Sequence, residues 1–133
     1  MKTTWQLYSE TVFYLLQCLP EQVTGFIITA HNPNGVLSPA PANQLADNLL
    51  LAELEKRAMR FRRIIGCSPD FRHQEAGWFV FASLSEGSEL AAQFQQNAIY
   101  WVEQGLLSLH PCLLTQHPVT ALGPFRNRLL LAS

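Results

Sequence analysis

The stretch VTGFIITAHNPNG, residues 23–35, passes in one step from an apolar run to a polar turn. Residues 23–30 are rich in β-branched and aromatic side chains and lack polar alternation, which predicts a central strand that is buried on both faces. In residues 31–35, the residue before Pro33 prefers extended backbone, and Asn34-Gly35 readily accepts positive φ. The stretch therefore predicts a strand in the middle of a sheet and a turn at the strand's exit.

The pattern downstream of this turn alternates between helices and strands. A long helix is predicted from Ser38 as N-cap, with Pro39 in the first turn and an apolar stripe that includes Leu45 and Leu49. Two short apolar runs follow, at 62–68 and 77–83, then a helix capped by Ser85 or Ser88, and then a hairpin of 98–104 and 106–112 that turns at Gln104-Gly105. This order predicts an α/β protein of the α+β kind, a two-layer sandwich with a split βαβ, ferredoxin-like core.

The two ends of the chain add to this core, which covers about residues 23–112. Helical spacing of Tyr8, Val12 and Leu15 predicts an N-terminal helix over residues 4–18. Residues 113–133 contain two prolines and predict a packed C-terminal extension with a short helix. We expect one domain over residues 1–133, because this length gives one core and is too short for two.

Composition and charge exclude several classes of protein. Nine Lys and Arg balance ten Asp and Glu, so the molecule as a whole does not attract nucleic acid or an anionic membrane. Five of the nine cations lie in residues 56–63, where the end of a helix favours positive charge; nucleic acid is therefore a disfavoured partner. Three widely spaced cysteines and a polar N-terminus predict a cytoplasmic protein without a signal peptide, and no apolar run approaches the roughly 20 residues of a membrane span.

Three polar loops are predicted to share one edge of the sheet. Right-handed crossovers make the first two strands parallel, with the third antiparallel between them, so the exit of the first strand meets the loop at 68–76 and the residues after the second helix. His73 and Glu75, with His31 across the cleft, form a candidate acid/base group. The candidate binding residues are Asn32, Asn34, Asp70, Arg72, Gln96 and Asn97.

Each of these residues also has an ordinary structural explanation. His31 and Asn32 fit a plain turn, Asp70 fits a turn in which its carboxylate accepts from nearby amides, and Gln96 fits the end of a helix. Arg72 and Glu75 form, in this interpretation, a surface pair worth about 0–1 kcal/mol. The sequence has no CxxC or HExxH and no phosphate-binding glycine loop, so we predict no metal and no cofactor.

Taken together, whole segments of the chain resemble an uncharacterised bacterial family, the domain of unknown function 3293. The resemblance rests on TAHNPNG, NQLADNLLLAELE, GCSPD, GWFVFASLS and FQQNAIYWVEQGLLSLHPC. It implies a bacterial origin and a compact α/β domain but no activity. The residues that match the polar pattern of the family are Asn32, Pro33, Asn43, Glu53, Glu75, Gln96 and Asn97. The long helix departs from the pattern, because Gln44, Ala46 and Asn48 stand where arginines are expected.

Three hypotheses for function remain at this point. The leading one is a non-catalytic module that binds a partner protein or a small ligand at the edge formed by loops 31–35 and 68–76. The second is a hydrolase-like enzyme, acting for example on nucleic acid, that uses His73 or His31 with Glu75. The third is an RNA-binding module that uses residues 56–63. A homodimer is compatible with each hypothesis, and the sequence does not decide whether the protein is an enzyme.

Overall fold

Strand β2 (Gly25–Thr29) lies in the middle of the sheet, as its sequence predicts. In the computed structural model, which describes residues 2–131, every residue of β2 except Thr29 is buried. Ile27 packs into one apolar core, and Phe26 and Ile28 pack into another on the opposite face of the sheet. Because successive side chains of a strand point to opposite faces, an uninterrupted apolar run suits a strand that is covered on both sides.

The described residues form an α+β domain with three helices and a mixed sheet of eight strands. The helices are α1 (Thr4–Ser9), α2 (Ala40–Lys56) and α3 (Leu84–Gln93), with short 3-10 helices η1 (Pro33–Gly35) and η2 (Phe125–Arg128). The other strands are β1 (Val12–Leu15), β3 (Phe61–Cys67), β4 (Gln74–Val80), β5 (Ala98–Glu103), β6 (Leu106–Pro111), β7 (Thr120–Pro124) and β8 (Leu129–Leu131). Within residues 2–131 no helix has the length and apolar character needed to cross a membrane.

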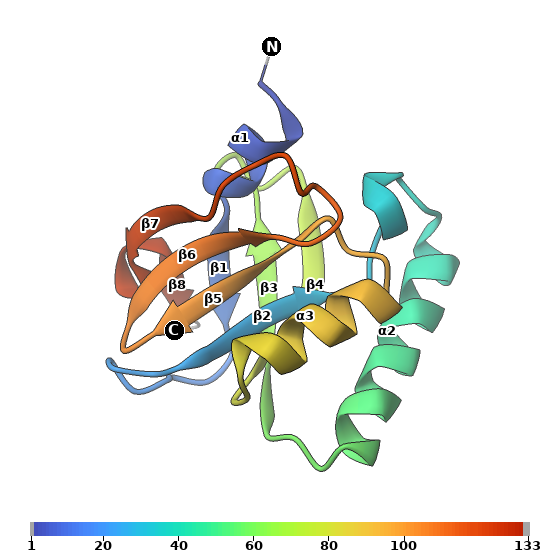
Figure 1. Cartoon of the computed structure of the whole chain (residues 1–133), viewed down its shortest axis with the longest axis horizontal. Helices are drawn as coiled ribbons and strands as arrows, with labels where there is room; N and C mark the ends of the chain where they lie inside the picture. Colours follow the sequence, from blue (N-terminus) through green and yellow to red (C-terminus); the bar gives the residue numbers. More distant parts are fainter. Residues whose placement is uncertain (1, 132–133) are drawn as a thin grey trace.

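The strands follow the order β7-β6-β5-β2-β4-β3-β1-β8 (Figure 1). Strand β4 pairs antiparallel with both β2 and β3, so β2 and β3 run in the same direction, as the crossover rule predicts. Only the pairing of β1 with β8 is parallel among the described strands. The predicted hairpin of β5 and β6 is present, and it turns at Gln104-Gly105.

The sheet is curled, and each of its faces covers a core (Figure 1). On one face, α2 and α3 cover an apolar cluster that includes Leu50, Leu54 and Leu90. On the other face, the curled strands enclose a second cluster in which Phe125 of η2 meets Phe13 of β1. The α+β class predicted from the sequence is confirmed, but two layers do not describe the whole domain, because the strands added at both ends bend the sheet around a second core.

The prediction of one N-terminal helix over residues 4–18 is wrong beyond Ser9. Helix α1 begins with a capping box of Thr3 and Gln6 but ends at Ser9, and Val12–Leu15 is the strand β1. Strand β1 pairs with β3 on one side and β8 on the other, and its side chains alternate between partly and fully buried. Pairing with strands distant in sequence overrides the helical spacing of the apolar residues.

The helix starts and ends also differ from the sequence pattern. Helix α2 has Pro39 rather than Ser38 at its N-cap. It ends at Lys56, two residues before Ala58, which adopts positive φ. Helix α3 is capped by Ser83, which forms a capping box with Glu86, rather than by Ser85 or Ser88. Both N-caps lie within a few residues of the predicted ones. Several neighbouring residues can cap the same helix, so the sequence pattern does not fix its first residue.

The predicted C-terminal extension over residues 113–133 contains β7, η2 and β8. Strand β7 continues the hairpin of β5 and β6, and β8 lies beside β1 at the opposite edge of the sheet. The short helix expected in this segment corresponds to η2. Residues 132 and 133 of the predicted extension lie outside the described residues.

Candidate functional site

The register of β2 and β4 brings the polar turn of residues 31–35 next to Glu75. The pairs in this ladder run from Phe26 with Val80 to Thr29 with Gly77. Continued by two residues, the same register sets position 31 opposite position 75. The exit of β2 and the start of β4 therefore share one edge of the sheet.

Asn32 is the centre of a hydrogen-bonded network at this edge. Its side-chain Nδ2 donates to Oε1 of Glu75 at 2.7 Å, and its Oδ1 accepts from the backbone N–H of Ser38 at 2.9 Å and from Nδ2 of Asn43 at 3.1 Å. The backbone N–H of Asn32 in turn donates to Oδ1 of Asn43 at 2.9 Å. Asn32 adopts left-handed backbone, with φ of 51°, which asparagine tolerates better than most residues. The network ties the turn, the start of α2 and β4 together.

The carboxyl group of Glu75 is half-buried, and its two oxygen atoms have different surroundings. Asn32 holds Oε1, whereas Oε2 has no hydrogen-bond partner within residues 2–131. In the described part of the chain, Trp78 Nε1 is the single side-chain nitrogen or oxygen that is both buried and without a partner. Oε2 of Glu75 has no partner and is not in that class, so it reaches solvent. Burial raises the pKa of Glu75, and the bond from Asn32 and the nearby charges of His31 and His73 partly oppose that rise.

Two tyrosines lie close enough to Glu75 to feel its charge, although no hydrogen bond in the described residues joins them to the Asn32 network, and the sequence pattern predicted neither position. The hydroxyl of Tyr8 accepts a bond from Nδ2 of Asn97 at 3.2 Å, and the hydroxyl of Tyr100 donates to the Tyr8 carbonyl at 2.6 Å. Burial raises the pKa of both tyrosines, and the negative charge of Glu75 contributes to each rise. No local signal could have found Tyr8, because only the tertiary fold carries α1 to this edge.

The other residues predicted after α3 hold the turn in place. Gln96 is buried, and its Nε2 donates to the carbonyl oxygens of His31 at 3.2 Å and Phe94 at 3.1 Å. The backbone N–H of Asn34 donates to the carbonyl of Gln95 at 2.7 Å, and its side chain donates to Oε1 of Gln95 at 3.1 Å. The edge is therefore built by three loops that bind one another.

The tip of the loop between β3 and β4 stands apart from the Asn32 network. Asp70 accepts from the Ser68 hydroxyl at 2.6 Å and from the Arg72 N–H at 3.1 Å, and both bonds are exposed. The Ser68 bond is the main cause of a lowered pKa at Asp70. His73 is exposed, and its side chain has no hydrogen bond to Glu75 or Asn32 within the described residues. The structure thus brings Asn32 and Glu75 together but leaves Asp70, Arg72 and His73 at the surface.

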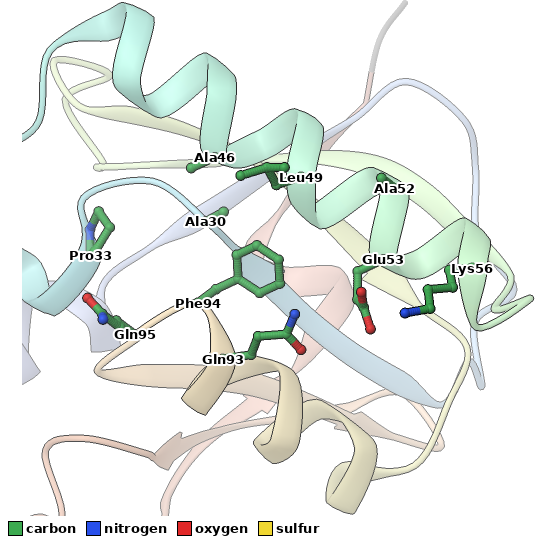
Figure 2. A pocket seen from close by; sticks show the side chains of 10 residues that line it. All are labelled: Ala30, Pro33, Ala46, Leu49, Ala52, Glu53, Lys56, Gln93, Phe94 and Gln95. Carbon is green, nitrogen blue, oxygen red and sulfur yellow. The ribbon is translucent and has the colours of Figure 1, made fainter.

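A separate groove of about 500 Å³ runs between α2 and the end of α3 (Figure 2). Figure 2 shows Ala46, Leu49 and Ala52 of α2 on one side, facing Phe94 and Gln93 on the other. The complete lining is Ala30, Pro33, Ala46, Leu49, Ala52, Glu53, Lys56, Gln93, Phe94 and Gln95. Pro33 and Gln95 belong to the loops of the edge, but Glu75 does not line this groove.

Neither the basic segment at residues 56–63 nor the cysteines form, in the described residues, a hydrogen-bonded network like that of Asn32. Arg63 donates two bonds of 2.9 Å to buried Asp47, and Arg57 donates to Glu53 at 2.9 Å, so two of the five cations in residues 56–63 have carboxylate partners within the chain. Burial raises the pKa of the Cys67 thiol, which opposes its use as a nucleophile. Across residues 2–131, the His, Cys, Asp and Glu side chains form no group of three or more that could hold a metal ion.

Comparison with known proteins yields one match. A family model described as "Protein of unknown function (DUF3293)" matches residues 28–99, which is more than half of the chain. No curated protein and no solved structure matches. The matched segment begins in β2, ends in β5 and includes Asn32, Asn43, Glu75 and Asn97.

Proposed function

The chain belongs to this family of proteins of unknown function, and from the geometry of the Asn32 network we propose that it is a non-catalytic binding module. Its binding surface is the edge at which residues 31–35 meet Glu75. The proposal rests on the surroundings of Glu75, whose Oε1 is fixed by Asn32 while Oε2 reaches solvent. A carboxylate held in this way offers a preorganised acceptor to a ligand or a protein segment that bears an N–H or O–H donor.

The Asn32 network supports binding more than catalysis. An acid/base pair of Glu75 with a histidine needs the two side chains to converge within hydrogen-bond reach, and the side chains of His31 and His73 make no bond to Glu75 in the described residues. The groove of about 500 Å³ lies beside this edge, and Glu75 is not among the residues that line it. The hydrolase-like alternative rests on one specific observation, the raised pKa of Glu75 close to the two histidines.

The rest of the proposal concerns the class and the location of the protein. The order β5-β2-β4-β3, with α2 and α3 as the connections, supports a ferredoxin-like core to which β1, β6, β7 and β8 are added. Three cysteines without a disulfide support a reducing, cytoplasmic location in a bacterium. The pairs of Arg57 with Glu53 and of Arg63 with Asp47 make an RNA-binding role for residues 56–63 the weakest alternative.

A fragment screen monitored by NMR tests the binding site. We expect polar fragments with amine or amide donors to shift the side-chain amide of Asn32 and the backbone amide of Gly35. Glu75→Gln should weaken binding about tenfold or more, since a hydrogen bond to a charged group contributes about 1.5–3 kcal/mol. Asp70→Asn removes a carboxylate from the exposed loop tip and should leave the affinity unchanged.

Two results would count against this proposal. Fragments whose shifts map only to residues away from the edge, or that bind Glu75→Gln as tightly as wild type, contradict a site at Glu75. Turnover of p-nitrophenyl esters or phosphates that disappears in both Glu75→Gln and His73→Ala would replace the binding module with the hydrolase-like enzyme.

A further inference from the structure

The hydroxyl group of Tyr8 has a donor hydrogen that the described part of the protein does not use. Its oxygen accepts a bond from Nδ2 of Asn97 at 3.2 Å, and within residues 2–131 no atom accepts its hydrogen. The hydroxyl of Tyr100 differs, because it donates to the Tyr8 carbonyl at 2.6 Å. A phenol hydroxyl supplies one donor as well as an acceptor. Tyr8 is only partly buried, so this free hydrogen can meet a ligand.

The turn of residues 31–35 packs against the Tyr8 hydroxyl. A Cβ atom built on Gly35 would lie 2.6 Å from Nδ2 of Asn97 and 3.8 Å from the hydroxyl oxygen of Tyr8. Gly35 belongs to the turn that Asn32 fixes, since its N–H donates to the Asn32 carbonyl at 2.8 Å. The Tyr8 hydroxyl therefore lies beside the same turn whose Asn32 side chain holds Glu75.

The sheet brings the segment after α1 to Glu75 by a second route. Gly66 of β3 pairs with Glu75 of β4 on one side and with Phe13 of β1 on the other. Residues directly opposite each other share a face of the sheet, so β3 places no side chain next to Glu75 at this position. Thr11, which lies between α1 and β1, comes nearest, with its Cγ2 3.5 Å from a Cβ atom built on Gly66. Residues 8–11 thus lie over the face of the sheet that carries Glu75.

The charge of Glu75 also acts on the Tyr8 hydroxyl. Burial is the main cause of the raised pKa of Tyr8, the bond from Asn97 opposes the rise, and the negative charge of Glu75 adds to it. Charges shift a neighbouring pKa mainly from within about 6 Å. The edge therefore presents an acceptor, Oε2 of Glu75, close to a donor, the Tyr8 hydroxyl.

A ligand that satisfies both groups must carry a donor and an acceptor side by side. An ammonium group would satisfy Glu75 but leave the Tyr8 hydrogen unpaired, which costs free energy once the ligand has displaced water. A secondary amide in its usual trans form has its N–H and C=O on opposite sides. A primary carboxamide has one N–H on the same side as its carbonyl oxygen, so it can bond both groups at once.

From this geometry we propose that the ligand of the edge contains a primary carboxamide, whose N–H donates to Oε2 of Glu75 while its carbonyl oxygen accepts from the Tyr8 hydroxyl. The inference rests on the proposed binding site at Glu75 and assigns Tyr8 as the residue that selects the ligand. A small molecule and the side-chain amide of a protein segment present the same group.

NMR titrations of the full chain at neutral pH with three compounds that share a phenyl ring test the carboxamide. Benzamide should bind about fivefold more tightly than N-methylbenzamide or benzylamine, since only benzamide makes both bonds. With ¹³Cζ-labelled tyrosine, the Tyr8 signal should move with benzamide and stay in place with benzylamine. Acetyl-Gly-Asn-Gly-N-methylamide carries the same carboxamide on a peptide. Its dissociation constant relative to that of benzamide distinguishes a protein segment from a small molecule as the source.

Two variants isolate the contribution of the hydroxyl. Tyr8→Phe should weaken benzamide about fivefold, to the level of N-methylbenzamide, and should leave benzylamine unchanged. Tyr14→Phe removes a hydroxyl from the neighbouring position to Phe13 on β1, which points to the opposite face of the sheet, and should change none of the affinities. If Tyr8→Phe does not fold, the comparison of the three compounds on wild type and the Tyr8 ¹³Cζ signal still decide the question.

The results separate the carboxamide from the binding site itself. Benzylamine or N-methylbenzamide that binds as tightly as benzamide, with an affinity that depends on Glu75 but not on Tyr8, would overturn the carboxamide and leave the binding site in place. If none of the three compounds binds, or if all bind Glu75→Gln as tightly as wild type, the proposed binding site fails and the carboxamide fails with it.

Discussion

At the level of single residues, the side chain of Asn32 links three separate parts of the polar edge. Its amide group bonds Glu75 on β4, Asn43 on α2 and the backbone of Ser38 at the same time. Left-handed backbone at Asn32 points the side chain toward these three partners, and an asparagine reaches this conformation at low cost. Asn32 therefore fixes the turn of residues 31–35, for which the sequence alone did not indicate a function.

The pH dependence of stability should report the environment of Glu75. Burial raises the pKa of this carboxyl above its ordinary value of 4.5, so the folded state binds the proton more tightly than the unfolded chain does. Ionisation of Glu75 then lowers the free energy of unfolding as the pH rises from 4.5 through the raised pKa. Urea unfolding at several pH values should show wild type losing stability relative to Glu75→Gln across this window, with a constant difference above it.

Asp70 provides a control of opposite sign for this measurement. Its pKa is lowered, mainly by the bond from Ser68, so its ionisation stabilises the folded state. Wild type should gain stability relative to Asp70→Asn as the pH rises from the lowered pKa to 3.8. A wild-type difference from Glu75→Gln that does not vary with pH would contradict the assigned environment of Glu75.

Gly35 should be less tolerant of alanine than another glycine with similar backbone. Gly35 and Gly123 have φ of 74° and 86°, so alanine costs about 1–2 kcal/mol of backbone strain at either position. At Gly35 a Cβ atom would also lie 2.6 Å from Nδ2 of Asn97, whereas nothing lies within 4 Å at Gly123. Displacing Asn97 sacrifices its bond to Tyr8, so Gly35→Ala should cost about 1 kcal/mol more than Gly123→Ala in urea unfolding.

A double-mutant cycle separates the contact with Asn97 from the backbone strain. In an Asn97→Ala background, Gly35→Ala should cost no more than Gly123→Ala does in wild type. An excess cost that survives this change would place its cause elsewhere than at Asn97.

At the level of elements, α2 is held against the sheet by a buried ion pair. Asp47 lies under the helix and receives two bonds of 2.9 Å from Arg63 of β3. The Arg63 guanidinium also stacks 4.2 Å above the ring of Trp78 on β4. The pair and the ring together fix the position of α2 over the two strands, although its outer face is left without partners in the chain.

Breaking this pair on one side should be costly. Asp47→Asn leaves the Arg63 charge without its counterion, and loss of one member of a buried pair costs about 3–5 kcal/mol. Because Arg63 is partly exposed, we expect a value near the lower end of that range in urea unfolding. Glu10→Gln, which removes the exposed bridge to Lys2, should cost about 1 kcal/mol or less. Equal effects of the two changes would show that the Asp47 pair does not anchor α2.

At the level of the whole molecule, the curled sheet is closed by the segment between its two outer strands. Strand β7 lies at one edge, β8 lies at the other, and η2 connects them (Figure 1). Phe125 of η2 is buried between Phe13 and Phe79, with ring centroids 5.8 and 6.0 Å away. The C-terminal segment therefore completes the second core rather than extending from a finished domain.

Removal of the Phe125 ring should destabilise the entire fold. Truncation of a buried phenylalanine to alanine costs about 3–5 kcal/mol, because the removed ring leaves a cavity. Phe125→Ala should lower the midpoint of urea unfolding accordingly, without changing the position of the Glu75 pH window. Phe71→Ala removes an exposed ring from the β3–β4 loop and should change stability by no more than about 0.5 kcal/mol. A small effect of Phe125→Ala would mean that the second core folds without η2.

The sequence alone determined the central strand, the β5–β6 hairpin and the meeting of residues 31–35 with Glu75 at one edge. These features follow from local patterns and from the handedness of the connections, which act over short stretches of chain. Asn32, Glu75, Gln96 and Asn97 could therefore be selected from the sequence, although their bonds could not.

Only the tertiary structure decided that residues 12–15 form a strand, that Tyr8 lies near Glu75 and that the sheet curls around Phe125. The reason is physical: the partners of these residues lie about 50 to 120 positions away along the chain. The pairing of β1 with β3 and β8, and the burial of Phe13 beneath Phe125, outweigh the helical spacing of the apolar residues at positions 8, 12 and 15.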